Sequence, residues 1–502
     1  METPDPVASR STVSWFAVVL LSATAVLFIV ASASRIAAPF GDSDEGINGA
    51  VWATNSRALR EAGPLDSRLG GRRLDGTSYA THPPYIVIST AVAEAVAGEN
   101  EWATRAPAWI GSIVAVGLLY PLVRTAGVGR PAAAAAAAAT ALTPMLFTYG
   151  FMLDTPVVAL PFGIAVLLAW HRQWQEPASE SPGRPVAVAG LCLLAALAGW
   201  QAAVLTGLAA VTLLARAVRH RKGAVTDALP FIIGGLAGIA LSLSWTWWVY
   251  GDLATLGDKF FRRSGESNTV GVGDMVSFQI PWVVQLLGLG IVGMGACIAA
   301  LWDHRVRALA AMSLAIVVVY AVVFRQAAAG HQYWNYWALI PTAVGFAWAF
   351  ERLARDLSRR ALLPTLGAVC VVVGVVNLFV LDDEALQYID EGHEVAELVI
   401  DGSIPEGQTA IPYVGQAFRP DAWLSYYTGL QPIPLRNADE IVDLSRRRPE
   451  DQVVILGWCE ETDASYELCR SLVQPRDLAV DGRTRPQPHL ERAADLASRA
   501  SS

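Results

Sequence analysis

The chain has little charge and few cysteines for its 502 residues. Only 16% of the residues are charged, and the formal net charge of -8 provides no basic excess for binding nucleic acid. The five cysteines are too few for a disulfide scaffold, and three of them lie inside apolar runs, where cysteine acts as a small hydrophobic residue: Cys192, Cys297 and Cys370. Composition therefore excludes a nucleic-acid-binding protein and a small disulfide-stabilised domain.

The chain is rich in apolar residues. Hydrophobic residues make up 53% of it, and several apolar runs are long enough to cross a hydrocarbon core of about 30 Å. The first run, residues 14–32, follows only one basic residue, Arg10, and no small-residue cleavage site precedes a polar mature chain. We interpret this run as a membrane anchor that is retained. The sequence predicts an all-α polytopic protein of the plasma membrane.

The apolar segments predict about eleven crossings plus interfacial helices. Residues 186–215 are too long for one crossing and have basic flanks on both sides, which favours a hairpin of two helices. Residues 85–98 are too short to cross comfortably and contain Glu94, which indicates an interfacial helix. The other crossings are expected at residues 13–34, 106–123, 132–150, 155–170, 231–250, 281–301, 309–325, 333–350 and 361–380.

Basic residues indicate which loops face the cytoplasm. The loops rich in arginine and lysine are residues 124–130, 171–184, 216–222, 303–307 and 351–360. With these inside, the segments expected outside are residues 41–84, 149–154, 251–279, 327–331 and the C-terminal part of the chain.

The composition changes after residue 380, which divides the chain into a membrane domain, residues 1–380, and a small extracytoplasmic α/β domain, residues 381–480. Short apolar runs at residues 409–414 and 453–458 predict strands, and residues 439–447 predict a helix. Cys459 and Cys469 would lie in an oxidising compartment, but the sequence does not give their separation, so their pairing stays open. Residues 481–502 are expected to form a polar tail.

Polar residues from distant parts of the sequence are predicted to meet on the outer side. A carboxylate pair at a membrane boundary is costly unless solvent, a substrate or a partner contacts it, and Asp44 and Glu45 follow the first apolar run directly. The other elements expected on this side are His82, Asp154, the pair Arg262-Arg263 in a Gly-rich polar loop, and His331 before an aromatic cluster. Their convergence predicts a polar site at the membrane interface.

Each element also has a purely structural interpretation. Asp154-Thr155-Pro156 is a suitable helix cap with proline in the first turn. His82 before Pro83-Pro84 is compatible with a solvated loop, and Arg262-Arg263 with a solvated turn. The aromatic residues at 333–337 fit an interfacial belt, and the pair at 44–45 fits an acidic loop tip. These alternatives stay open at the level of sequence.

The order of short motifs resembles the GT-C superfamily of membrane glycosyltransferases that use polyprenyl-phosphate sugars. The motifs are the acidic pair after the first apolar run, His-Pro-Pro-Tyr at 82–85, Trp-Ala-Thr-Arg-Ala-Pro at 102–107 and Leu-Asp-Thr-Pro at 153–156. The protein O-mannosyltransferases and the lipid A aminoarabinose transferases are most similar, over residues 14–350. The C-terminal domain lies outside this resemblance.

The resemblance implies a set of site residues. Asp44 would be the catalytic carboxylate with Glu45 beside it, and Asp154 would match a second acidic position near the acceptor or the donor sugar. His82 stands where the family often has lysine, although a neutral histidine neutralises a phosphate less well at pH 7. Arg105 and His331 also fall in motifs of the family. With the two arginines of the outer loop, the candidate ligands of the donor phosphate are His82, Arg105, Arg262, Arg263 and His331.

The chemistry is consistent with these roles. A sugar on a lipid phosphate carries a good leaving group, so one carboxylate has to accept the proton of the acceptor hydroxyl while cations stabilise the departing phosphate. Asp44 is the expected base of a direct displacement that inverts the anomeric centre. A divalent cation is conceivable, but no ligand cluster has diagnostic spacing, so we expect no metal or other cofactor.

Two other classes compete with a transferase. A secondary transporter of a small solute would place carboxylates near the bilayer midplane within two related halves, whereas the acidic residues here lie at span ends without an internal repeat. A membrane scaffold would have no reason to gather acid, histidine and arginine at one interface. The expected partners are membrane lipid, a polyprenyl-phosphate sugar and an acceptor that is a protein, a lipid or a glycan; the sequence specifies neither sugar nor acceptor.

Overall fold

A computed structural model describes residues 6–41, 43–175, 183–220, 225–264, 271–380, 404, 407–414, 420–455, 479–480, 483–484 and 489–500. The chain forms two compact units, which are treated separately below. Unit 1 comprises Met1–Ile36, Ala80–Ser89 and Arg105–Asp382, and unit 2 comprises Ala37–Tyr79, Thr90–Thr104 and Asp383–Ser502. Each unit therefore combines segments that are far apart in the sequence.

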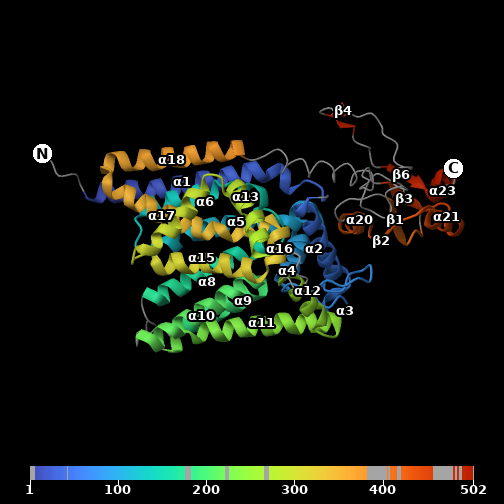
Figure 1. Ribbon diagram of the computed structural model, residues 1–502, viewed down its shortest axis with the longest axis horizontal. Coiled ribbons are helices and arrows are strands. Elements are labelled where there is room, and N and C mark those ends of the chain that lie inside the picture. The colour runs from blue at the N-terminus through green and yellow to red at the C-terminus, as the bar shows by residue number, and fades with distance from the viewer. Residues whose placement is uncertain are drawn as a thin grey trace. The chain divides into compact units, whose positions relative to one another are not determined.

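Unit 1 is helical, and most of its long helices run side by side (Figure 1). In chain order the helices are α1 (Pro6–Ile36), α4 (Tyr85–Ala97), α5 (Glu101–Arg124), α6 (Arg130–Ala141), α7 (Pro144–Tyr149), α8 (Thr155–Gln175), α9 (Gly183–Ala198), α10 (Trp200–His220), α11 (Leu229–Tyr250), α12 (Ala254–Ser264), α13 (Val272–Leu287), α14 (Gly290–Ala299), α15 (Arg307–Val323), α16 (Arg325–Gly330), α17 (Leu339–Asp356) and α18 (Arg359–Val380). Residues 90–104, which include most of α4 and the first residues of α5, belong to unit 2. Three 3₁₀ turns join them: η1 (Val225–Asp227), η2 (Ala300–Trp302) and η3 (Gln332–Ala338).

Small residues allow these helices to pack closely. All alanines at 132–139 are buried, where α6 packs against α17 and α1. On α11 a Cβ added to Gly238 would lie 2.6 Å from the Cβ of Ala196 on α9, so only glycine permits this approach. The alanine run is therefore a helix-packing surface.

Five helical segments within the described residues are long and apolar enough to cross a membrane: α1, α5, α8, α10 and η1 with α11. A sixth is added if the bent pair α13–α14 forms one crossing. Helices occupy all the segments predicted to cross, and residues 186–215 form two helices, α9 and α10, as the sequence predicts. The protein is an integral membrane protein, and the figure of about eleven crossings stays a prediction.

One predicted crossing is wrong in form. Residues 281–301 were expected to be a single helix, but α13 and α14 meet at an angle of 114°. Gly288 at the bend has φ +52°, which favours glycine. Asn377 of α18 stabilises the break, because its Oδ1 accepts from the Leu289 N–H at 2.8 Å and its Nδ2 donates to the Leu142 carbonyl at 2.9 Å. Hydropathy alone gives no indication of this bend.

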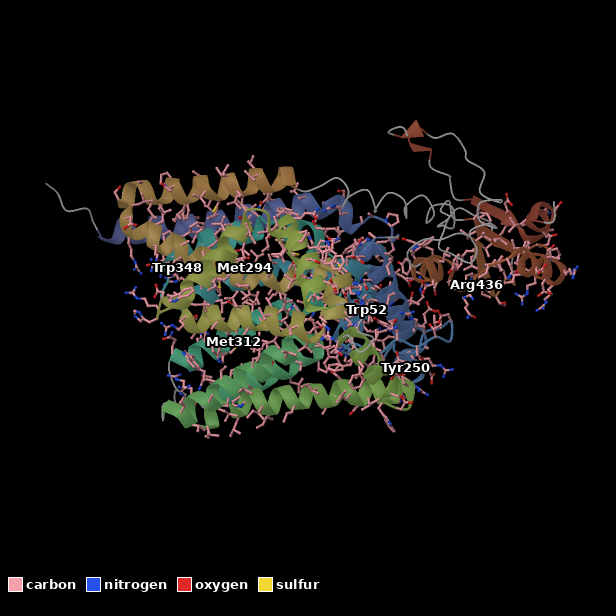
Figure 2. All side chains as sticks on the ribbon, in the orientation of Figure 1. Trp52, Tyr250, Met294, Met312, Trp348 and Arg436 are labelled. Carbon is pink, nitrogen blue, oxygen red and sulfur yellow. The ribbon has the colours of Figure 1, made fainter. Side chains whose placement is uncertain are left out.

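Three of the basic loops meet at one end of unit 1. The Gly129 N–H donates to Glu351 Oε2 at 2.7 Å, and Trp348 Nε1 donates to Asp303 Oδ2 at 3.1 Å. Residues of all three loops line one small cavity of about 20 Å³, among them Arg305 and Arg352. Figure 2 shows side-chain nitrogens gathered at the end of the helices where Trp348 is labelled.

Unit 2 contains a helical segment after the first apolar run, α2 (Asp44–Glu61) and α3 (Gly63–Asp66), together with a small α/β fold. Four strands form a sheet in the order β2-β1-β3-β6, with β1 parallel to β2 and β3, and β6 antiparallel to β3. The elements are β1 (Ala410–Val414), α20 (Pro420–Thr428), β2 (Gln431–Pro434), α21 (Ala438–Arg447), β3 (Gln452–Ile455), β6 (His489–Arg492) and α23 (Ala493–Ala500); a short hairpin is formed by β4 (Ala479–Val480) and β5 (Arg483–Thr484).

The predicted strand at 409–414 and the predicted helix at 439–447 are confirmed by β1 and α21. The interpretation of residues 481–502 as a polar tail is wrong for residues 489–500, which supply β6 and α23 to the domain. Ala493, Leu496 and Ala497 recur at helical spacing and are buried against Val453 and Ile455 of β3. Cys459 and Cys469 lie outside the described residues.

Candidate active site

His82 is the centre of a polar cluster in unit 1. Arg263 Nη1 and Nη2 lie 3.3 and 3.4 Å from His82 Nε2, and Thr155 Oγ1 lies 3.3 Å from His82 Nδ1. Because arginine only donates, Nε2 accepts and Nδ1 carries the proton that is donated to Thr155. This network assigns a neutral tautomer to His82.

The backbone before Pro83 is fixed by α10 and α11. The Ala80 N–H donates to the Tyr250 hydroxyl at 2.9 Å, and the Ala80 carbonyl accepts from Thr246 Oγ1 at 2.8 Å. Trp200 Nε1 donates to the Thr81 carbonyl at 3.1 Å. His82 is only 6% exposed, so the alternative of a solvated loop residue is wrong.

Two cations reach the cluster from α12. Lys259 Nζ donates to Thr81 Oγ1 at 2.9 Å, and Arg263 follows four positions later on the same helical face. The expectation of a polar loop at Arg262-Arg263 is therefore corrected: this part of the chain is helical, and Asp252 accepts from the Ala254 N–H at its start. Arg262 is exposed, so Arg263 is the member of the pair that enters the cluster.

His331 lies beside the cluster and is linked to it through Trp334. Its ring lies 5.9 Å from the ring of Trp334, and the guanidinium of Arg263 lies 5.7 Å from the same indole. His331 Nδ1 is buried and forms no hydrogen bond with any residue that the structure describes. The aromatic segment of η3 therefore contributes to the cluster and is not only an interfacial belt.

Both histidines are held neutral at pH 7. Burial, followed by the charges of Arg263 and Lys259, lowers the pKa of His331 to about 4. Burial, then Arg263, Lys259 and His331, lowers the pKa of His82 well below its usual 6.5. The fixed positive charge of the cluster is therefore supplied by Lys259 and Arg263, while His82 and His331 offer neutral hydrogen-bonding groups.

Asp154 is next to the cluster as the cap of α8. It is 5% exposed, its Oδ1 lies 2.7 Å from the Thr155 N–H, and its carbonyl accepts from the Val158 N–H at 3.0 Å. The interpretation of Asp154 as a helix cap is therefore confirmed. The cap places a carboxylate one residue before Thr155, which contacts His82.

Arg105 is fully buried in α5, and its Nη1 donates to the Ile36 carbonyl at 3.0 Å, the last residue of α1. A cation at this position satisfies a terminal helix carbonyl. Its assignment to the donor phosphate stays a prediction, as does that of Arg262.

Asp44 and Glu45 lie in unit 2 as the first residues of α2. Ser43 caps the helix by accepting from the Gly46 N–H at 2.9 Å, and the acidic pair lies in the first turn, where the helix dipole favours negative charge. Asp44 is half-buried and Glu45 is 7% exposed. The pair therefore begins an ordered helix, and the alternative of an acidic loop tip is wrong.

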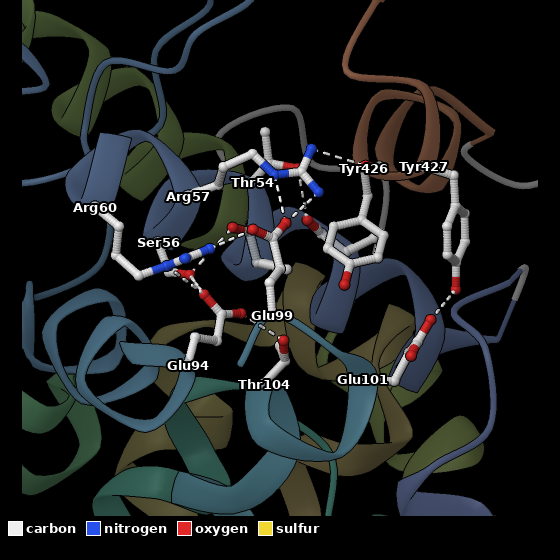
Figure 3. A network of polar contacts seen from close by, with 12 residues as sticks. Thr54, Ser56, Arg57, Arg60, Glu94, Glu99, Glu101, Thr104, Tyr426 and Tyr427 are labelled. Atoms are coloured by element: carbon white, nitrogen blue, oxygen red, sulfur yellow. Dashed lines mark hydrogen bonds and ion pairs between the residues drawn. The ribbon is translucent and has the colours of Figure 1, made fainter. Parts of the chain in front are cut away.

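Unit 2 also contains an ion-pair network that sequence reasoning did not identify (Figure 3). Glu94 accepts from Thr104 Oγ1 at 2.5 Å and from Arg60 Nε at 3.1 Å, and Glu99 pairs with both Arg57 and Arg60. Burial raises the pKa of Glu99, but the hydrogen bonds and charges of both arginines outweigh it, and the net pKa is lowered. The network fixes α2 to the segment that precedes α5.

Sequence reasoning also missed Lys259, Thr81, Thr155 and Trp334. A signal existed for Lys259, because Lys259 and Arg263 have the i, i+4 spacing of one helical face. Among the described residues, no three His, Cys, Asp or Glu side chains group as a metal site. The expected independence from metals stays a prediction.

Residues 81–248 match the family model described as dolichyl-phosphate-mannose-protein mannosyltransferase. This segment begins beside His82 and contains Asp154. No curated protein sequence matches the chain at a significant level.

Two solved structures share the fold. ArnT from Cupriavidus metallidurans, bound to undecaprenyl phosphate, matches with a TM-score of 0.64 at 16% identity, covering 94% of this chain and 97% of that one. AglB from Archaeoglobus fulgidus, an archaeal oligosaccharyltransferase in complex with an inhibitory peptide and a dolichol-phosphate, matches with a TM-score of 0.56 at 11% identity, covering 88% of this chain and 69% of that one. The fold is that of the GT-C membrane enzymes. Together, the match of residues 81–248 to the mannosyltransferase model and the shared fold indicate a glycosyltransferase, similar to membrane enzymes that bind polyprenyl phosphates.

We expect the folded protein to lose stability as the pH falls below about 6.5. In this range the unfolded chain protonates His82 and His331, whereas the folded protein keeps both neutral because their pKa values are lowered. The unfolded state then binds more protons, so the free energy of unfolding decreases with pH. Thermal midpoints at pH 7 and pH 5 measure the drop. His331→Gln should reduce it, and His304→Gln, on an exposed loop, should leave it unchanged; an equal drop in both variants would contradict this assignment.

Proposed function

We propose that the protein transfers a sugar from a polyprenyl-phosphate donor to an acceptor hydroxyl at the outer face of the membrane. The observation that carries this proposal is the pair of cations, Lys259 and Arg263, that meets the buried neutral His82 and His331 in unit 1. Two cations beside neutral hydrogen-bonding groups are suited to a phosphate, and arginine can bind two of its oxygens at once.

The proposed reaction is a single displacement. The acceptor oxygen forms a bond to the anomeric carbon, its proton passes to the Asp44 carboxylate, and the bond between that carbon and the phosphate oxygen breaks. The electron pair leaves with the polyprenyl phosphate, whose charge Arg263 and Lys259 stabilise. Attack opposite the leaving group inverts the anomeric centre. In this scheme Glu45 assists Asp44, and Asp154 orients the acceptor or the donor sugar.

The two ends of unit 1 support the proposed orientation in the membrane. α8 begins at Thr155 beside the cluster, and its last turn approaches the basic loops, since Gln173 hydrogen-bonds Asp227 next to α10 and α11. Its 21 residues span about 30 Å, close to the thickness of a hydrocarbon core. The positive-inside rule then supports a cytoplasmic location for the basic end and an extracytoplasmic one for the cluster.

The transporter alternative is less well supported. It requires charged groups near the middle of broken helices, whereas His82 and His331 are outside the helices and Asp154 caps one. The one sharply bent pair, α13–α14, has no charged residue at its bend around Gly288. A transfer reaction accounts better for two cations of α12 that lie beside polar residues outside the helices.

A transfer assay tests the function. The purified full chain in lipid nanodiscs would be given radiolabelled polyprenyl-phosphate mannose, arabinose or aminoarabinose with membrane glycans, lipids and proteins as acceptors. We expect one donor to yield free polyprenyl phosphate and a product of inverted configuration. Retained configuration would exclude the displacement, and ion-driven solute uptake without any glycosylated product would favour the transporter.

A further inference from the structure

Unit 2 has an open polar cleft of about 450 Å³, a size typical of ligand pockets. Its lining combines one face of α2, the loop before Tyr79, the end of α4 and the last turn of α20. The lining residues are Thr54, Arg57, Glu61, Leu74, Asp75, Glu99, Ser425, Tyr427, Thr428 and Gly429. The C-terminal domain thus completes a cleft whose other wall is the helix that begins with Asp44.

The lining disfavours an anionic ligand. It contains three carboxylates and one arginine, and that arginine is already engaged. Arg57 pairs with Glu99, donates to the Tyr426 carbonyl at 2.8 Å and lies 4.9 Å from the Tyr426 ring centroid. A phosphate or an acidic lipid would therefore meet mainly negative charge in this cleft.

The lining suits a ligand with many hydroxyl groups. Glu61 is exposed and forms no hydrogen bond or ion pair with the residues that the structure describes. Asp75 accepts from Ser425 Oγ at 3.3 Å, and its other oxygen accepts from Thr77. The Tyr427 hydroxyl donates to Glu101 at 2.9 Å and accepts from the Phe40 N–H at 2.7 Å, so its ring is what it offers to the cleft. Carboxylates accept hydrogen bonds from hydroxyl groups, and an aromatic ring packs against the face of a sugar.

The cleft is too far from Asp44 for a single sugar to occupy both. At 1.5 Å per residue, Thr54 and Glu61 lie about 15 and 25 Å from Asp44 along the axis of α2, and about 100° around it. One sugar ring is much shorter than this distance. An extended ligand that follows the surface of α2 would connect them.

We infer that the cleft binds an uncharged oligosaccharide part of the acceptor, several sugar residues away from the hydroxyl that is glycosylated. This inference rests on the proposed function, and it assigns the acceptor to glycans. An extended peptide is disfavoured, since the lining has one aliphatic side chain, Leu74, and no row of apolar pockets for alternate side chains.

A binding experiment tests the cleft without turnover. The full chain in detergent, fluorescently labelled, would be applied to an array of neutral gluco-, manno-, galacto- and arabino-oligosaccharides of increasing length, and to a peptide array. We expect at least one saccharide series to bind, more tightly as it lengthens. The double variant Glu61→Gln/Asp75→Asn should bind that series about tenfold or more weakly, because two charge-assisted hydrogen bonds are weakened. Glu61→Gln alone should show part of this loss.

The controls separate the cleft from the catalytic step. Asp439→Asn, an exposed position on α21 of the same unit, should bind like the wild type. Circular dichroism and thermal melting confirm that each variant is folded. Absence of saccharide binding, equal binding by the double variant, or peptide binding that the double variant loses would overturn the inference. Transfer activity with no saccharide binding would remove the cleft proposal alone, whereas normal transfer by Asp44→Asn would remove the catalytic proposal alone.

Discussion

Asp44→Asn should abolish measurable sugar transfer, with a loss of kcat of about 10²–10⁴-fold, the range for removal of a general base. Asparagine has nearly the same size as aspartate, and Ser43 continues to cap α2 in this variant. It cannot accept the proton of the acceptor hydroxyl. The loss should therefore appear in the chemical step, with donor affinity unchanged. Initial rates at saturating donor, with donor binding measured separately, distinguish the two effects.

A matched control for this substitution is Asp66→Asn. Asp66 lies on α3 in the same unit and is exposed, so the same change of charge there should leave kcat within about twofold, as surface changes usually do. If Asp44→Asn transfers sugar at the rate of Asp66→Asn, Asp44 is not the base. Glu45→Gln would then be the next variant to measure.

Arg263→Gln should lower kcat/KM by about 10²–10³-fold, the range for loss of one preorganised group that stabilises transition-state charge. Arg263 contacts His82 and Trp334 in the buried cluster, where a charge interacts more strongly than in water. The loss should appear mainly in kcat, because negative charge develops on the phosphate as it leaves. Polyprenyl phosphate, as a product inhibitor, should bind more weakly to the same variant.

Arg262→Gln is the matched control, since Arg262 is the adjacent arginine of α12 and is exposed. We expect it to lose much less activity than Arg263→Gln, because a charge exposed to water interacts more weakly than a partly buried one. A second readout is the pH profile: the charge of Arg263 lowers the pKa of His82, so its removal raises that pKa. Protonated His82 should then restore part of the lost rate as the pH is lowered in Arg263→Gln and not in the wild type. Equal losses of kcat/KM in the two arginine variants would show that the total positive charge of α12 matters and that the position of Arg263 does not.

Much of the helical architecture could be predicted from the sequence because apolar length is a strong signal in a membrane protein. The hairpin at residues 186–215, the packing of the alanine run and the strand β1 all follow from local composition. The bend at Gly288 could not be predicted in this way, since it depends on Asn377 from a distant helix. The association of residues 489–500 with the sheet also escaped detection, because β6 is short and its partner β3 is distant in sequence.

The candidate site shows the same division. His82, Asp154, Arg263 and His331 were predicted to lie near one another. In the structure Arg263 contacts His82 directly, Asp154 is linked to His82 through Thr155, and His331 is linked to Arg263 through the Trp334 ring. The charge of the site was not predictable. His82 and His331 were expected only as ligands of the donor phosphate, and the structure shows that burial and neighbouring cations hold both of them neutral. Lys259 carries the positive charge with Arg263.

By itself the sequence determined the class of the molecule: a polytopic membrane protein with a carboxylate pair after its first apolar run and motifs in the order of a GT-C transferase. These properties depend on residue type and spacing along the chain. Only the tertiary structure decided which cation of α12 enters the cluster, which histidines stay neutral, and that α20 of the C-terminal domain completes a cleft with α2. Those properties depend on burial and on contacts between distant segments, because desolvation and short-range charge act only where folding places the groups.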